Sequence, residues 1–95
     1  MKNVVIVGAG KIGGAIARML AATGDYAVTV ADRSEAQLAA IERGPAVATA
    51  AVDITDRTAL TALLTGKFAV LSAAPFNLTG AIAESAVEAG IHYLD

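Results

Sequence analysis

Three glycines near the start of the chain have the spacing Gly-x-Gly-x-x-Gly, at Gly8, Gly10 and Gly13. Gly8 can turn the backbone sharply, Gly10 can let a ligand approach the main chain, and Gly13 can let a helix pack closely. Apolar positions, including Ile12 and Met19, then recur with helical spacing, so a helix is expected to begin in the turn. Its free N–H groups and the positive end of its dipole would hold a phosphate.

A carboxylate follows at the distance that a nucleotide ribose requires. The β-like run at 26–31 ends in Asp32, 19 residues after Gly13. A carboxylate at that strand end can accept hydrogen bonds from both hydroxyls of a ribose diol. Glycine-rich turns also occur for packing alone, and Asp32 could be an ordinary loop carboxylate. The combination of turn, helix and strand-end Asp32 nevertheless favours a bound dinucleotide.

The residues beside Asp32 leave two cofactors open. Arg33 could stack on an adenine or meet a 2′-phosphate, or it could be an ordinary surface arginine. Arg33 and Ser34 together would welcome a 2′-phosphate, whereas the charge of Asp32 would repel one. We therefore expect NAD or NADP as the cofactor, with NAD favoured.

Strands and helices are expected to alternate regularly along the chain and so to position these residues. This alternation requires right-handed crossovers and a parallel sheet with helices on both faces. The fold class expected is α/β, a Rossmann-like doubly wound parallel sheet of about five strands in the order 3-2-1-4-5. The strands are expected at about 3–7, 26–31, 46–52, 68–73 and from 91.

Capping residues predict where the helices begin. The second helix is expected over about 34–43, opened by a Ser-x-x-Gln capping box at Ser34. Thr55 or Asp56 can cap the third helix, and Asn77 can cap the fourth. Each helix would then begin just beyond the carboxyl end of a strand.

A sheet of this order opens a crevice between its first and fourth strands at their carboxyl ends. Asp53 and Ile54, which follow the third strand, are expected to line it. Asp53 could hold an adenine amino group or only order the turn before the next helix. The small, uncharged Ala73, Ala74 and Pro75 after the fourth strand would let a nicotinamide ribose approach the backbone, although packing alone would also explain them.

Composition narrows the class of protein. The 95 residues suffice for one domain, 1–95, and the formal charge of −2 is scattered without a basic patch for nucleic acid or an anionic membrane. No apolar stretch approaches the ~20 residues of a membrane span. Cysteine is absent, which is compatible with a reducing cytoplasm, and the single histidine, His92, lacks ligand-type neighbours. We expect a cytoplasmic protein without a metal site.

Five segments together resemble the N-terminal NAD(P)-binding domain of saccharopine dehydrogenase and its relatives. The resemblance covers the whole chain. Its more specific parts are Ala-Ala-Pro after the fourth strand and Gly-Ile-His-Tyr-Leu-Asp at the fifth. The segments are Val-Gly-Ala-Gly-Lys-Ile-Gly at 7–13, Val-Ala-Asp-Arg-Ser at 30–34, Val-Asp-Ile-Thr-Asp at 52–56, Ser-Ala-Ala-Pro-Phe at 72–76 and Ala-Gly-Ile-His-Tyr-Leu-Asp at 89–95.

The resemblance implies an oxidoreductase. Enzymes of this family transfer hydride between a nicotinamide and a carbon attached to a secondary amine, in amino-acid-type substrates. The resemblance also assigns contacts in the crevice. Gly8, Gly10, Lys11 and Ile12 would contact the pyrophosphate, Asp32 and Arg33 the adenosine ribose, Asp53 and Ile54 the adenine, and Ala73, Ala74 and Pro75 the nicotinamide side.

Family members continue beyond the fifth strand into a substrate and dimerisation domain. We therefore expect the chain to be the cofactor-binding part of a longer protein that could form a homodimer and whose catalytic residues lie elsewhere. No residue of 1–95 is nominated as catalytic, and the fragment alone is expected to be inactive.

Two other functions are compatible with a glycine turn and a strand-end carboxylate. Nucleotide-sensing modules of potassium-channel and transporter regulators bind a dinucleotide without chemistry, but the apolar segment 73–76 and the segment 91–95 argue against this alternative. A short-chain reductase would need a Tyr-x-x-x-Lys pair, and neither Tyr26 nor Tyr93 is followed by lysine four residues later.

Overall fold

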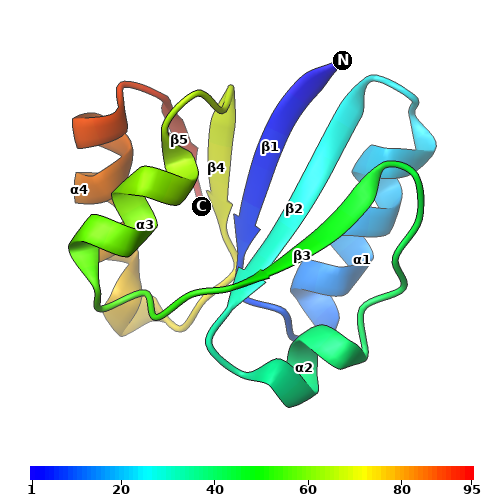
Figure 1. Cartoon of the computed structure of the whole chain (residues 1–95), viewed down its shortest axis with the longest axis horizontal. Helices are drawn as coiled ribbons and strands as arrows, with labels where there is room; N and C mark the ends of the chain where they lie inside the picture. The colour runs from blue at the N-terminus through cyan, green and yellow to red at the C-terminus, as the bar shows by residue number, and fades with distance from the viewer.

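Strands and helices alternate from end to end in the computed structural model, which describes all 95 residues (Figure 1). All five strands are parallel and lie in the order β3-β2-β1-β4-β5, which confirms the expected Rossmann-like α/β fold. The strands are β1 (Lys2–Val7), β2 (Tyr26–Asp32), β3 (Val47–Ala51), β4 (Ala69–Ser72) and β5 (His92–Leu94). The helices are α1 (Lys11–Ala22), α2 (Glu35–Ala39), α3 (Arg57–Leu64), the 3-10 turn η1 (Phe76–Leu78) and α4 (Thr79–Ala89).

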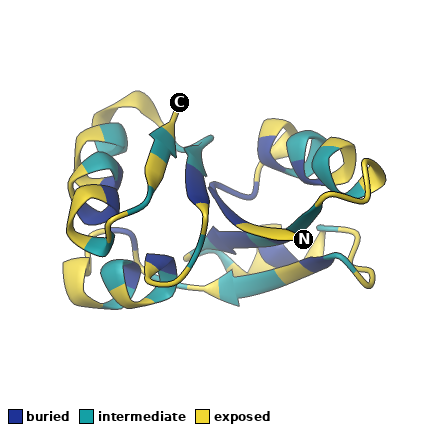
Figure 2. Ribbon diagram, turned by 90° about the horizontal axis from the view of Figure 1, so that it is seen from above, coloured by how far each residue is buried: buried dark blue, intermediate teal, exposed yellow.

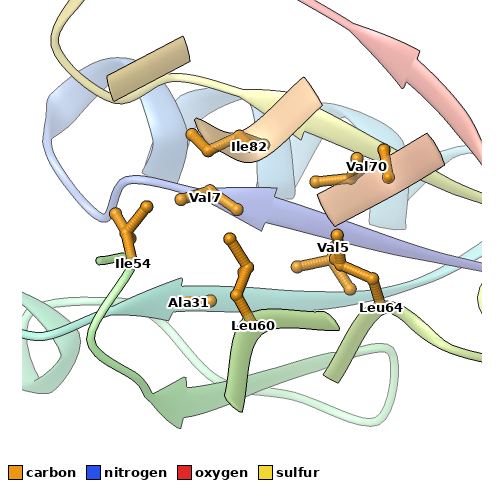
Figure 3. Close-up of a cluster of buried hydrophobic side chains, with 9 residues drawn as sticks. Val5, Val7, Ala31, Ile54, Leu60, Leu64, Val70 and Ile82 are labelled. Atoms are coloured by element: carbon orange, nitrogen blue, oxygen red, sulfur yellow. The ribbon is translucent and has the colours of Figure 1, made fainter. Parts of the chain in front are cut away.

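Each face of the sheet has its own hydrophobic core. Helices α3 and α4 cover one face, where Leu60 and Ile82 pack against Val7 of β1 (Figure 3). Helices α1 and α2 cover the other face, where Leu38 lies in one cluster with Ile6. The buried residues accordingly concentrate between the sheet and its helices (Figure 2).

Strand β1 lies at the centre of the sheet because its side chains are apolar on both faces. Val5, Ile6 and Val7 are fully buried, and Val4 is 5% exposed. A continuous β-branched run of this kind is typical of a parallel strand with helices on both sides. The glycine turn that follows β1 therefore lies at the carboxyl end of the central strand.

Helix α2 is shorter than expected. It ends at Ala39, whereas the sequence predicts a helix over about 34–43. The next two N–H groups, of Ala40 and Ile41, bond back three residues instead of four, and an isolated bridge between Gly44 and Val47 then turns the chain into β3. The segment after Ala39 is used to reverse direction, and this ends the helix early.

The start of α4 also differs from the prediction. Asn77 does not cap this helix but lies inside η1, which begins after Pro75. The Leu78 N–H donates to the Pro75 carbonyl over 2.9 Å, so the chain makes one tight turn before α4 begins at Thr79. The cap of α3 is as expected, because the Asp56 side chain accepts a hydrogen bond from the Ala59 N–H.

Candidate functional site

A cleft of about 570 Å³ lies where the carboxyl ends of the strands meet the loops that follow them. It is lined by the turns after β1, β2, β3 and β4, as expected for a doubly wound sheet whose strand order reverses beside β1. Ten of the thirteen site residues proposed from the sequence line this cleft. They are Gly8, Gly10, Asp32, Arg33, Ser34, Asp53, Ile54, Ala73, Ala74 and Pro75.

Three proposed residues do not line the cleft. Lys11 lines a neighbouring groove, Ile12 is 71% exposed on the outside of α1, and Gly13 is buried under the glycine turn. Sequence reasoning missed four other residues that do line it, namely Gln37, Thr55, Asn77 and Leu78. Each of these lies within three residues of a predicted one, so extending each predicted turn by one helical turn would have found them.

Two of the glycines are required by the protein's own packing. Gly8 has a φ of +111°, and a Cβ there would lie 2.7 Å from the Ala73 carbonyl oxygen. A Cβ at Gly13 would overlap the Gly8 carbonyl oxygen. These close approaches bring the end of β1, the start of α1 and the end of β4 together at the cleft.

Gly10 is different, because nothing in the protein requires the absence of its side chain. Its φ of −70° and ψ of −171° suit any residue. A Cβ there would meet only the Gln37 side-chain oxygen, at 3.9 Å. Since Gly10 lines the cleft and has no side chain, its main chain is accessible from the cleft. This is what close approach of a ligand to the backbone requires.

Helix α1 begins at this turn without a capping side chain. Gly10 occupies the N-cap position and offers no side-chain acceptor, and the first turn contains no acidic residue. Helices α2 and α3, in contrast, are capped by Ser34 and Asp56. The first N–H groups of α1 therefore have no side-chain acceptor, and they carry the positive end of the helix dipole beside the cleft.

Asp32 ties the two nearest turns together. One carboxylate oxygen, Oδ2, accepts a hydrogen bond from the Ala9 N–H, and the other, Oδ1, accepts one from the Ser34 N–H, both over 2.8 Å. A carboxylate can accept about four hydrogen bonds, so roughly two positions remain for a ligand. Asp32 lines the cleft as predicted, and its hydrogen bond to the glycine turn was not predicted.

Asp53 orders its own turn, which was one of its two predicted roles. Its Oδ1 accepts hydrogen bonds from the Thr55 hydroxyl at 2.6 Å and from the Thr55 N–H at 2.9 Å. These bonds, the hydroxyl first, lower the pKa of Asp53 below its ordinary value, and the positive charge of Arg33 adds to the effect. Asp53 and Arg33 thus present opposite charges to the same cleft.

His92, the single histidine, does not line the cleft. The His92 ring packs against Phe68 with 5.1 Å between ring centroids, and the Lys2 ammonium lies 4.4 Å from the Phe68 centroid. No group of three or more histidines, cysteines or carboxylates is placed to hold a metal ion. None of the helices is long and apolar enough to cross a membrane.

Comparison with solved structures finds the same fold in dehydrogenases. Saccharopine dehydrogenase (L-Glu forming) from Saccharomyces cerevisiae superimposes with a TM-score of 0.88 and 29% identity, over 98% of this chain and 21% of that one. A Rossmann-fold NAD(P)-binding family protein from Shigella flexneri gives 0.81 and 20%, over 98% and 50%. A short-chain dehydrogenase/reductase from Veillonella parvula gives 0.79 and 20%, over 97% and 45%.

The chain therefore spans half or less of the length of these proteins. No curated protein matches it by sequence. The family described as saccharopine dehydrogenase NADP binding domain, however, matches residues 4–95. With its glycine turn, strand-end carboxylate and parallel sheet, the chain belongs to this family of NAD(P)-binding Rossmann domains of oxidoreductases.

Proposed function

We propose that the cleft binds NAD in preference to NADP, as the cofactor site of a hydride-transferring enzyme. The observation that carries the proposal is the pairing of an uncapped helix N-terminus with an anchored carboxylate in one cleft. The helix N-terminus suits the pyrophosphate, and Asp32 suits a ribose diol. These are the two groups that a dinucleotide presents in sequence.

The other cleft residues suit the two ends of the cofactor. Arg33 and Asp53 present a planar cation and a hydrogen-bond acceptor, which suit the face and the amino group of an adenine. Ile54 is 8% exposed and adds an apolar surface. Ala73 and Ala74 are half-buried on the side of the cleft beside Gly8, where they would leave room for the nicotinamide ribose.

The preference for NAD follows from how Asp32 is held. Two backbone N–H groups fix both oxygens of its carboxylate, so the side chain cannot swing aside without losing both bonds. A 2′-phosphate on the ribose would place further negative charge beside it. The repulsion between these like charges is what weakens NADP binding.

We propose that the full-length protein oxidises or reduces the carbon of a secondary amine or imine in an amino-acid-type substrate. The similarity to saccharopine dehydrogenase from yeast supports this substrate class. Residues 73–75 carry no titratable side chain. The titratable residues that line the cleft are Asp32, Arg33 and Asp53, which are proposed for the adenosine end of the cofactor. Substrate selection and proton transfer would belong to other parts of the protein.

Replacing Asp32 with Asn tests the cofactor assignment. Asp32→Asn keeps the shape of the side chain but removes the charge, and its amide nitrogen cannot accept one of the two backbone N–H bonds that Asp32 accepts. It should weaken NADH binding by about tenfold or more, because hydrogen bonds to charged groups contribute roughly 1.5–3 kcal/mol. NADPH binding should weaken less or improve, since the repulsion is gone. Isothermal calorimetry with both cofactors measures the two changes. Asp25→Asn, in the exposed turn before β2, is the matched control. Equal losses for both cofactors would discard the role of Asp32.

A further inference from the structure

A second hollow, of about 670 Å³, lies between α1 and α2 beside the cleft. Two residues, Gly10 and Gln37, line both spaces. Because Gly10 has no side chain, the side chain of Gln37 is the group that stands between them. We call this hollow the α1–α2 groove.

The α1–α2 groove carries a cation close to this shared wall. Lys11 follows Gly10 directly and lines the groove. Both salt bridges of the structure are formed by Arg57 on α3, so the Lys11 ammonium has no acidic partner. Arg18 lies two turns further along α1, about 10 Å away by helix geometry. It lines that end of the groove together with the acidic Glu42.

Asp32 is anchored to the same two segments that border the groove. Its carboxylate bonds to the N–H of Ala9 beside Gly10 and to the N–H of Ser34 at the start of α2. A ribose held by Asp32 would therefore lie next to the boundary that Gln37 occupies. A phosphate on its 2′ oxygen would need a cation to offset Asp32. Arg33 lines the cleft as well, but the charge of Asp53 acts on it. Lys11, which forms no salt bridge, lies across the boundary in the groove.

Accepting the cofactor site proposed above, we infer that Gln37 determines the choice between NAD and NADP by separating the 2′ position from Lys11. The side chain makes no hydrogen bond that would hold the fold, and only the Gln37 backbone N–H contributes to the Ser34 cap. Gln37 is thus free to serve as a partition. Its removal would join the two spaces while the cap of α2 stays in place.

The test compares NADH and NADPH dissociation constants, measured by calorimetry, for the 95-residue chain and four variants. Gln37→Ala should raise the affinity for NADPH relative to NADH by roughly tenfold, because a charge-assisted contact to Lys11 becomes available. Lys11→Met in the Gln37→Ala background should abolish this gain, while Lys11→Met alone should leave the ratio near that of the wild type. Gln37→Leu, of similar volume, should also keep the wild-type ratio.

Each outcome has a defined reading. Three results would overturn the role of Gln37 as a partition. The ratio of the NADH and NADPH dissociation constants could stay unchanged in Gln37→Ala, or the gain in NADPH affinity could persist when Lys11→Met is added. The third such result is a Gln37→Leu variant with the same ratio as Gln37→Ala. If the wild type binds neither cofactor, the proposed cofactor site itself is wrong, and the inference fails with it. If the wild type binds NADH but Gln37→Ala leaves the NADH to NADPH ratio unchanged, only the inference about Gln37 is wrong and the proposed cofactor site stands.

Discussion

A valine at position 10 should separate binding from folding. In the structure, a Cβ at Gly10 meets only the Gln37 side-chain oxygen at 3.9 Å, and the extended backbone there suits a β-branched residue. The main cost to stability is the loss of a favourable N-cap residue, which is about 1 kcal/mol. Gly10→Val should therefore fold and unfold cooperatively.

The effect on binding should be far larger. A phosphate oxygen hydrogen-bonds a backbone N–H at about 2.8 Å, and the valine side chain would force it to retreat by roughly 1 Å or more, beyond bonding distance. Losing two charge-assisted bonds of about 1.5–3 kcal/mol each lowers affinity at least about a hundredfold. The dissociation constant for NADH would thus rise while the unfolding free energy changes little.

Two measurements on the same variant check this reasoning. Urea unfolding followed by circular dichroism gives its stability, and calorimetric titration with NADH gives its affinity. Gly80→Val, where a Cβ would meet nothing within 4 Å and which does not line the cleft, is the matched control and should bind like the wild type. A folded Gly10→Val variant with wild-type affinity would refute the assignment of the glycine turn to the pyrophosphate.

Three further outcomes are expected. Gly13→Ala should lower the unfolding free energy by roughly 3 kcal/mol or more in urea titrations, because its Cβ overlaps the Gly8 carbonyl oxygen. Leu60→Ala, at a fully buried position, should cost about 2–5 kcal/mol in the same assay. The pKa of Asp53 is lowered in the folded state, so its carboxylate favours folding at neutral pH and this contribution fades as the pH falls below about 4. Unfolding curves of the wild type and Asp53→Asn should accordingly converge in acid, and a constant difference from pH 7 to pH 2 would contradict this.

The position of the cleft could be predicted because the parallel topology determines it. Once β1 and β2 are recognised, the crossover rule brings the carboxyl ends of the strands to one edge of the sheet. Gly10 and Asp32 must then lie there, whatever the details of packing. This is why ten of the thirteen proposed residues line one cleft.

The apolar spacing in the sequence did not predict which residues of α1 pack against the sheet. Ile12 and Met19 helped to predict α1 by their spacing, yet they are 71% and 70% exposed. The residues of α1 that are buried are Gly13 and Ala17, because small side chains let the helix lie close to the sheet at these positions. Ile16 and Leu20 are half-buried against the same core. Apolar spacing detects a helix but not the distance at which it packs.

The irregular segments depend on local competition that a pattern does not resolve. Asn77 is a good cap in isolation, but Pro75 begins a tight turn that encloses it. The capping box at Ser34 is only half formed. The Ser34 hydroxyl accepts the Gln37 N–H, while the Ser34 N–H donates to Asp32 and not to the Gln37 side chain. A tertiary contact at the site has replaced half of a local motif.

The most direct test of the cofactor site is the thermal unfolding midpoint of the 95-residue chain with NADH or NADPH. A ligand at 100 times its dissociation constant adds about 2.7 kcal/mol, which corresponds to roughly 10 °C or more in a domain of this size. We expect such a rise with NADH and a smaller one with NADPH at equal concentration. An unchanged midpoint with millimolar NADH would contradict the cofactor site, and a larger shift with NADPH would contradict the role of Asp32.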